Sequence, residues 1–269
     1  MAAKKPAPMS PATSACSRAA VLVAGSLAEG PDRWPKSVQA VVRSLVCRLA
    51  AARGLPRPEL PYPHDDAAEA ELDTVAVPAD WSVLDIGEIH QELLALELAE
   101  AAAALTVRQS GGRHAQGSWY TPQPLAREMT RLSLTVAIEQ LIGGEPEQLL
   151  RLRAVDPACG AGVFLVEAAH RITDNYACRL AGTDTAPPLL AERLRPTVIY
   201  ECVFGMDIDP VAVDLARASL WFEVGGTPPF AWLDQNIACV NPLAGPNELP
   251  ARLLDAMGEP PLETARAAR

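Results

Sequence analysis

The stretch that most constrains the fold is residues 154–165, which read Ala-Val-Asp-Pro-Ala-Cys-Gly-Ala-Gly-Val-Phe-Leu. A short apolar run ends in Asp156, a Gly-x-Gly turn follows, and a helical pattern then begins. This order is typical of a ligand cradle in an α/β sheet. Gly160 and Gly162 lack Cβ atoms, so the turn can adopt positive φ and its backbone can approach a ligand closely. We therefore expect Asp156 to end a strand at the edge where open α/β folds bind ligands.

Two further segments flank this stretch. Residues 117–122 read Gly-Ser-Trp-Tyr-Thr-Pro, and residues 204–210 read Phe-Gly-Met-Asp-Ile-Asp-Pro. These segments resemble motif X (117–122) and motif II (204–210) of the adenine-N6-specific DNA methyltransferases, and Asp-Pro-Ala-Cys-Gly-Ala-Gly at 156–162 resembles motif I. The three matches follow one another in the chain order of that family. The large methyltransferase polypeptides of restriction-modification and phage-resistance systems also have a helix that residues 86–94 resemble. Leu165 stands where a dinucleotide fingerprint has its third glycine, which favours S-adenosylmethionine over a nicotinamide cofactor.

The resemblance implies a fold and a cofactor. The fold is α/β: an incomplete Rossmann-like sheet of the S-adenosylmethionine-dependent methyltransferases, preceded by an α-helical N-terminal region. The cofactor is S-adenosyl-L-methionine, and the resemblance assigns neither a catalytic residue nor a metal ligand to this chain. The expected cofactor-binding residues are Tyr120, Thr121, Pro122, Asp156, Pro157, Ala158, Cys159, Gly160, Gly162, Phe164, Asp207, Ile208 and Asn241.

The chemistry of the cofactor suits these residue types. By position and by resemblance, Asp207 ends the second strand and accepts hydrogen bonds from both ribose hydroxyls. Thr121 and the helix N-terminus behind it suit the cofactor carboxylate, and Asp156 faces the amino-acid end. Helix capping stays an alternative for Thr121 and Asp207, as core packing does for Phe164.

The residue expected to meet the adenine is Asn241. Residues 233–243 read Leu-Asp-Gln-Asn-Ile-Ala-Cys-Val-Asn-Pro-Leu and resemble the adenine-contact segment of the family, Leu-Asp-His-x-Ile-x-x-Gly-Asn-Ser-Leu. Val240 and Pro242 replace the Gly and the Ser on either side of Asn241. Because valine disfavours positive φ and proline lacks a backbone N–H, we expect weakened adenine binding.

The catalytic motif of the family, Asn/Asp-Pro-Pro-Tyr/Phe, holds an adenine flipped out of the duplex. No such motif follows residue 243, and Thr227-Pro228-Pro229-Phe230 has the wrong first residue and the wrong position. We therefore expect the cofactor-binding part of a site-specific adenine-N6 DNA methyltransferase, inactive by itself. Its expected partners are DNA, contacted mostly through regions absent from this chain, and a second polypeptide that carries the catalytic half. Its origin is either a truncated gene product or a split subunit.

Two other hypotheses stay open. A non-catalytic interaction subunit, or a degenerate remnant, would keep the methyltransferase fold without turnover, and the altered residues Val240 and Pro242 favour it. A methyltransferase that acts on a small molecule or a protein is the other, and the family-specific segments at 117–122 and 156–162 count against it.

The composition limits the partners and the compartment. The net charge is −10 and the pI is about 4.9, whereas binding to a phosphate backbone needs clustered Lys and Arg. The six cysteines have no C-x-x-C spacing, so we expect reduced, buried thiols in a cytoplasmic protein. No apolar run reaches the roughly 18–20 residues of a membrane span, so no membrane is expected among the partners.

The patterns along the chain predict four parts and several elements. The parts are a disordered tail (1–17), a helical N-terminal region (18–110), a partial methyltransferase domain (111–245) and a C-terminal tail (246–269). Before the glycine loop we predict three helices, at 37–54 with Ser37 as N-cap, at 85–105, and from Thr121 to 142. From the loop onward we predict a strand at 153–156, a helix at 162–174, an insertion at 175–196, a strand at 203–207 and a helix at 211–222 capped by Asp209.

Overall fold

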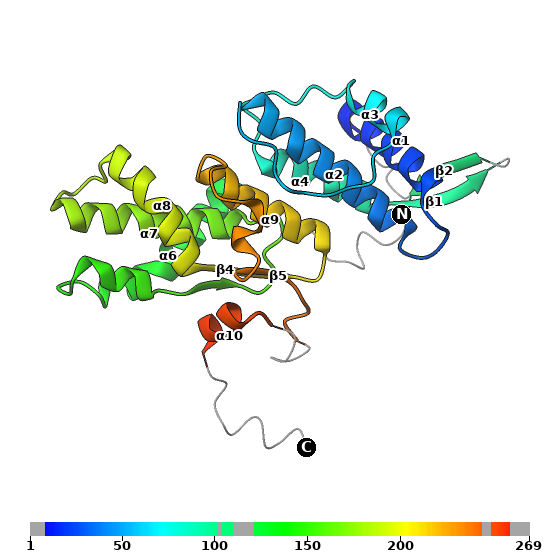
Figure 1. Cartoon of the computed structure of the whole chain (residues 1–269). Coiled ribbons are helices and arrows are strands. Elements are labelled where there is room, and N and C mark those ends of the chain that lie inside the picture. The colour runs from blue at the N-terminus through cyan, green and yellow to red at the C-terminus, as the bar shows by residue number, and fades with distance from the viewer. Residues whose placement is uncertain (1–8, 102–103, 110–120, 244–248, 259–269) are drawn as a thin grey trace, which may run out of the picture. The chain divides into compact units, whose positions relative to one another are not determined.

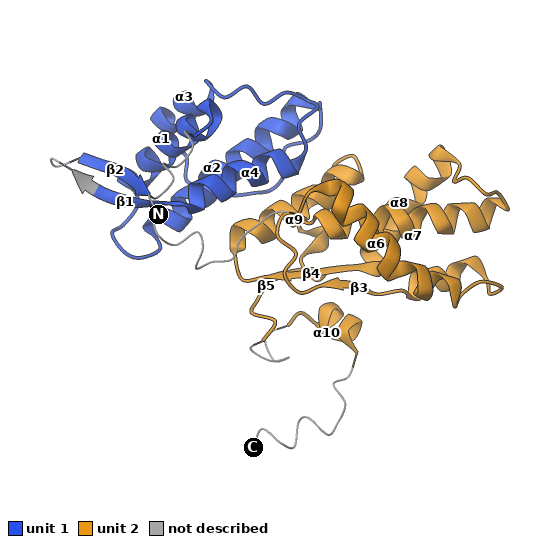
Figure 2. Cartoon of the chain, turned by 180° about the vertical axis from the view of Figure 1, so that it is seen from behind, with its two compact units in different colours: residues 1–119 blue, residues 120–269 orange. Residues whose placement is uncertain are grey.

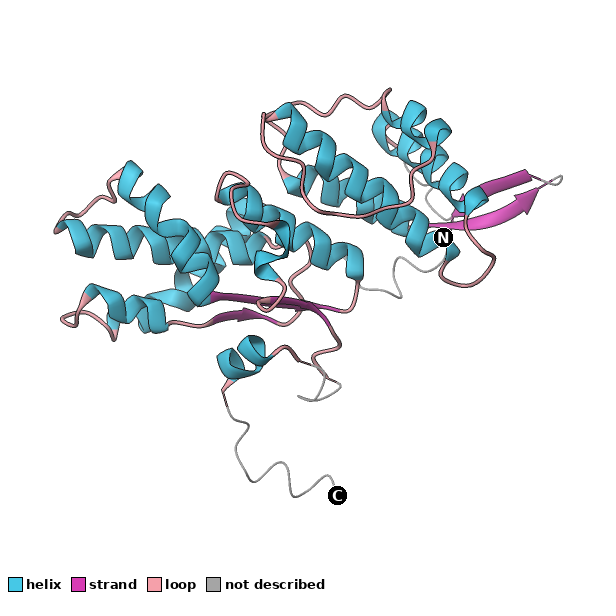
Figure 3. Cartoon of the chain, in the orientation of Figure 1, coloured by secondary structure: helices cyan, strands magenta, loops and turns pink. Residues whose placement is uncertain are grey.

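The computed structural model describes residues 9–101, 104–109, 121–243 and 249–258. They belong to two compact units, residues 1–119 and residues 120–269 (Figure 2). The architecture is mixed α/β, with a two-stranded sheet in the first unit and a three-stranded sheet in the second (Figure 3). No helix within the described ranges is both long and apolar enough to cross a membrane.

The first unit is mainly helical. Its elements are α1 (Pro11–Ser26), α2 (Arg33–Ala52), α3 (Asp66–Leu72), α4 (Val83–Leu94), β1 (Leu96–Ala101) and β2 (Ala104–Gln109) (Figure 1). Leu45 and Leu49 of α2 are fully buried, as the helical spacing of apolar residues predicts. Ser37 does not cap this helix: it lies inside α2 and its hydroxyl donates to the Arg33 carbonyl at 2.7 Å.

The expected disordered tail is wrong from Pro11 onward, because α1 begins there. Ser10 caps the helix by accepting a hydrogen bond from the Thr13 N–H at 3.0 Å, and Pro11 occupies the first turn. Cys16 is fully buried, and α1 packs against α2. Packing against the rest of the unit therefore stabilises α1, which would be only marginally stable as an isolated helix.

The helix expected at 85–105 is wrong beyond Leu94. There α4 ends, and β1 and β2 pair antiparallel as a hairpin. Across the hairpin, Arg108 Nε donates to Glu97 Oε1 at 2.7 Å. The segment is rich in alanine, but helix propensity is a weak prior, and strand pairing satisfies the same backbone groups.

The second unit is built on a parallel sheet with strand order β3-β4-β5. The strands are β3 (Ala154–Asp156), β4 (Val203–Asp207) and β5 (Ile237–Cys239). The helices are α6 (Gln123–Glu139), α7 (Val163–Ala181), α8 (Pro188–Cys202), α9 (Pro210–Glu223) and α10 (Ala251–Met257), with 3-10 helices at Pro146–Arg151 and Phe230–Leu233. In Figure 1, α10 lies on the opposite side of the sheet from α7 and α9.

Alternate residues of β4 face two different cores, as the pleat of a strand requires. Phe204 and Met206 pack with Leu253 of α10. Val203 packs into the larger core, together with residues of α7, α8 and α9. The central strand is therefore covered on both faces, which explains its continuous apolar sequence.

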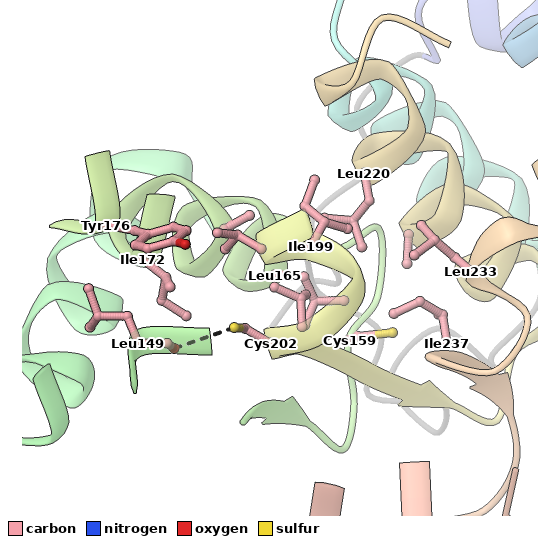
Figure 4. Packing of buried hydrophobic residues seen from close by; sticks show 14 of the residues in the cluster. Leu149, Cys159, Leu165, Ile172, Tyr176, Ile199, Cys202, Leu220, Leu233 and Ile237 are labelled. Carbon is pink, nitrogen blue, oxygen red and sulfur yellow. Dashed lines mark hydrogen bonds between the residues drawn. The ribbon is translucent and has the colours of Figure 1, made fainter. Parts of the chain in front are cut away.

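The larger core fixes how closely α7 lies on the sheet (Figure 4). A Cβ atom at Gly205 would come 2.8 Å from Leu165 Cδ1, so the glycine permits this close approach. The carboxyl half of β4 therefore lies directly against the start of α7. Just before the strand begins, the thiol of Cys202, the last residue of α8, donates to the Leu149 carbonyl at 3.6 Å.

Several predicted elements are confirmed. The strand at 203–207 is β4, the strand at 153–156 is β3 with one residue fewer, and the helix at 211–222 is α9 with one more residue at each end. Asp209 caps α9 by accepting from the Val211 N–H at 2.9 Å, as expected.

Other expectations need correction. Pro122, not Thr121, is the N-cap residue of α6. The insertion expected at 175–196 is largely helical, because α7 continues to Ala181 and α8 follows. The expected C-terminal tail contains α10, which is anchored by its buried Leu253. Burial against the sheet supplies the stability that this short helix lacks alone.

Candidate cofactor site

The carboxyl ends of the three parallel strands lie along one edge of the sheet. In the register, Asp156 pairs with Gly205 and Asp207 pairs with Cys239. The loops after β3 and β4 and the segment after β5 therefore leave the sheet side by side. This is the edge at which open α/β sheets bind ligands.

The loop after β3 is held by its backbone. The Cys159 N–H donates to the Met206 carbonyl at 2.8 Å, which ties the loop to β4. Gly160 has φ +53 and Gly162 has φ +86, so both adopt the left-handed conformation that glycine favours. A Cβ atom at Gly162 would lie 3.1 Å from the Ala216 Cα, so the start of α7 lies close to α9. Glycine is thus required there for both conformation and space.

Asp207 joins the two predicted motifs. Its Oδ2 accepts from the Gly160 N–H at 2.9 Å, and its Oδ1 accepts from the Asp209 N–H at 3.0 Å. The residue is half-buried. A carboxylate offers about four acceptor sites, so two remain for ligand donors such as hydroxyl groups.

Asp156 lies near Asp207, whose negative charge acts on the Asp156 carboxyl. Burial raises the pKa of Asp156, the charge of Asp207 raises it further, and a hydrogen bond from the Ala158 N–H at 3.0 Å opposes both effects. A cationic or hydroxyl-bearing ligand placed here would relieve the repulsion between the two carboxylates.

The cysteine of the loop has an unreactive thiol. Cys159 is buried, and burial together with Asp207 and Asp156 raises the pKa of its thiol. A protonated thiol is a poor nucleophile, so Cys159 contributes through its backbone and its packing. All six cysteines are free, but the expectation of buried thiols is wrong for Cys239, which is exposed after β5, and Cys178 is only half-buried.

Three further predicted residues offer apolar surface beside the loop. Pro157 and Ala158 are exposed, and Phe164 is half-buried. Asp156, Pro157 and Phe164 line a groove of about 270 Å³, whose other wall is formed by α6. Beyond β4, Ile208 is 69% exposed directly after Asp207. An exposed isoleucine beside a carboxylate suits a ligand with a flat apolar part and hydroxyl groups.

Asn241 follows β5 at the same edge. The Val240 N–H donates to the Asp207 carbonyl at 3.0 Å, so the backbone stays paired one residue beyond the strand. Asn241 is exposed, and its Oδ1 accepts from the Leu243 N–H at 2.9 Å. Val240 therefore serves the strand pairing, and Asn241 stabilises the turn that follows.

The first turns of α6 are connected to α7 by a residue that sequence reasoning missed. Glu167 of α7 is 5% exposed, and it accepts from Gln123 Nε2 at 3.1 Å and from Arg127 Nε at 3.2 Å. This contact fixes the start of α6, directly after the half-buried Thr121 and the exposed Pro122. The signal in the sequence is an acidic residue on the otherwise apolar face of the helix.

A second missed residue is Ser219 of α9. Its buried hydroxyl donates to the Ala161 carbonyl of the glycine loop at 2.7 Å. Nothing in the sequence distinguishes this serine from an ordinary small helix residue. Among the predicted site residues, Tyr120 lies outside the described residues.

Comparisons with known proteins give no match to a family model, to a curated protein or to a solved structure. What the site can bind therefore follows from its own groups. They are two adjacent carboxylates, the backbone of a glycine loop, and the exposed side chain of Ile208, all at the carboxyl edge of a parallel sheet. Such a set suits a ligand with several hydroxyl or cationic donors and a flat apolar part.

Proposed function

We propose that residues 120–269 bind S-adenosylmethionine, in a Rossmann-like sheet, as the cofactor-binding part of a site-specific adenine-N6 DNA methyltransferase of a restriction-modification or phage-defence system. One observation carries the proposal: the Gly160 N–H donates to Asp207 Oδ2 at 2.9 Å. This bond joins the motif I-like loop and the motif II-like strand end at the carboxyl edge of parallel strands. The free thiols suit a cytoplasmic location.

The donor and acceptor types fit the parts of this cofactor. Asp207 has acceptor capacity left for the ribose hydroxyls, and Ile208 offers apolar surface for the adenine. Asp156 suits the positively charged amino-acid end because a cation lowers the cost of ionising it. Thr121 and the start of α6 are proposed for the carboxylate. Asn241 is proposed for the adenine.

Methyl transfer requires more than these residues. The surroundings of Thr227–Phe230 are not those of a base-binding motif, which needs an accessible aromatic ring. Phe230 is only 5% exposed and packs edge-on against Trp221. The Trp221 Nε1 also donates to the Pro228 carbonyl at 2.8 Å. We therefore propose that the adenine-binding catalytic motif and most DNA contacts come from another polypeptide segment.

A second candidate function is a non-catalytic subunit or remnant that keeps the fold without binding the cofactor. It is favoured by the internal hydrogen bonds of the proposed site. Both Asp207 oxygens accept backbone N–H groups, and Asn241 Oδ1 accepts from Leu243. Each side chain thus has a structural role without any ligand.

Calorimetric titration with S-adenosylmethionine separates the two candidates. If the proposal is right, the chain binds the cofactor saturably, and Asp207→Asn weakens binding by about 10- to 100-fold, because a charge-assisted hydrogen bond contributes about 1.5–3 kcal/mol. The matched control is Asp174→Asn, an exposed aspartate on α7, which should bind as the wild type does. A folded wild-type chain that does not bind would refute the proposal and favour the non-catalytic subunit.

A further inference from the structure

The segment after α2 encloses a pocket in the first unit. Gly54 ends the helix with φ +66, and four prolines between positions 56 and 63 then keep the chain extended. Arg43 Nη1 donates to the Pro61 carbonyl at 2.5 Å, so the segment runs back along α2, and its buried Leu60 anchors it there. Between this segment, α2 and α3 lies a pocket of about 270 Å³, which we name the Arg57 pocket. Its lining includes Cys47, Arg48, Leu55, Arg57, Tyr62 and Glu69.

Two arginines line this pocket, and their charges are compensated differently. Arg48 is paired twice, since its Nη2 lies 2.6 Å from Glu69 Oε2 and its Nη1 lies 2.7 Å from Asp73 Oδ1. Arg57 forms no ion pair with any residue that the structure describes. Its Nη2 donates to the Tyr62 hydroxyl at 3.0 Å, and its guanidinium carbon lies 5.7 Å from the centre of the Tyr62 ring.

The other neighbour of Arg57 is the thiol of Cys47. Burial raises the pKa of this thiol, and the hydrogen bond and the charge of Arg57 only partly oppose that effect. The hydrogen-bond partners of Arg57 are thus a protonated thiol and a phenol hydroxyl, and neither compensates its positive charge. A guanidinium presents a planar fork of donors that matches a carboxylate, so the partner that this side chain lacks is an anion.

The rest of the lining limits the size and the shape of that anion. The carboxylate of Glu69 is occupied, because it binds Arg48 and accepts from the Ser44 hydroxyl at 3.0 Å. Ala51 and Leu55 add apolar surface. The volume lies near the lower end of the roughly 300–1,000 Å³ that is typical of ligand pockets, so the pocket suits a small molecule.

We infer that the Arg57 pocket binds a small organic acid that has one carboxylate and a flat apolar body. One uncompensated cation matches one anionic charge, so a carboxylate fits better than a doubly charged phosphate. The carboxylate accepts hydrogen bonds from Arg57, and the body lies against Ala51 and Leu55. The inference concerns the first unit alone and does not depend on the proposed cofactor.

Calorimetric titration of the full chain with benzoate tests the inference. Benzoate should bind with a Kd of about 1 mM or lower, and benzamide, which has the same shape without the charge, should bind at least about tenfold more weakly. Arg57→Gln should weaken benzoate binding by about 10- to 100-fold, because it removes charge-assisted hydrogen bonds. The matched control is Arg108→Gln in the hairpin of β1 and β2, where the arginine side chain is 71% exposed. This variant loses the same charge and should bind benzoate as the wild type does.

Several results would overturn the inference, provided that circular dichroism shows all three chains to be folded. A wild-type chain that does not bind benzoate, or that binds benzamide equally well, would exclude a carboxylate site. Equal binding of benzoate by the Arg57→Gln and Arg108→Gln variants would place the ligand outside the Arg57 pocket. Tighter binding of phenyl phosphate than of benzoate would assign the pocket to a phosphate ester instead of a carboxylate.

Discussion

Replacing Gly162 with alanine tests whether the close packing of α7 on α9 determines the shape of the glycine loop. At φ +86 an alanine costs about 1–2 kcal/mol, because its Cβ approaches the following carbonyl oxygen. The new Cβ would also lie 3.1 Å from the Ala216 Cα, and such overpacking costs about 1–3 kcal/mol more. We expect a total loss of roughly 3 kcal/mol in the free energy of unfolding.

The chain contains a matched control at the other end of the same helix. Gly182 caps α7 with φ +65, and a Cβ atom built there meets no atom within 4 Å. Gly182→Ala should therefore show the conformational cost alone, about 1–2 kcal/mol. The difference between the two variants measures the contact with Ala216.

Thermal and urea unfolding measure both effects. For a unit of this size, Gly162→Ala should lower the Tm by about 6–12 °C, and Gly182→Ala by no more than about half of that. Equal losses in the two variants would refute the argument from close packing. In calorimetry with the proposed cofactor S-adenosylmethionine, only Gly162→Ala should also weaken binding, because it displaces the Gly160 N–H from Asp207.

Three further predictions concern single side chains. Glu167→Gln should destabilise the second unit by about 1–3 kcal/mol in urea unfolding, because two hydrogen-bond donors of α6 then no longer face a buried carboxylate. The control Glu128→Gln, at an exposed position, should change the stability much less. Burial raises the pKa of Asp156, so the folded state favours the protonated carboxyl. The stability that this protonated carboxyl gives is present at low pH and is lost as the pH rises above about 4. Asp156→Asn should therefore gain stability relative to the wild type between pH 4 and pH 7, and a pH-independent difference would contradict this. A maleimide should label the exposed Cys239 first, while Cys16, whose burial raises its pKa to about 12, should react only after unfolding; equal labelling in peptide mass spectra would contradict the fold of the first unit.

Local signals predicted the second unit well. An apolar run followed by Asp156 and two glycines predicted β3, its loop and α7, because a sharp turn needs left-handed backbone that glycine supplies. Asp209 and Pro210 predicted the start of α9, since a capping oxygen and a fixed φ act within one turn. These interactions involve neighbours in sequence, so they can be read without knowledge of the fold.

Contacts distant in sequence could not be predicted in this way. The hairpin after α4 depends on pairing between β1 and β2, which outweighed the helix propensity of its alanines. The role of Glu167 depends on the position of α6 over α7. The pattern of α6 gave its helix but not which apolar face would be buried.

The sequence by itself determined the order of strand, glycine loop and helix, and it determined which carboxylates end the strands. Those features depend on backbone conformation and capping within a few residues. Only the tertiary structure decided that Asp207 accepts a hydrogen bond from the Gly160 N–H, that Cys239 is exposed and that Leu132 and Val136 of α6 stay exposed. These outcomes depend on which surfaces meet when distant elements pack, and the free energy of packing is shared among many residues rather than encoded in any short segment.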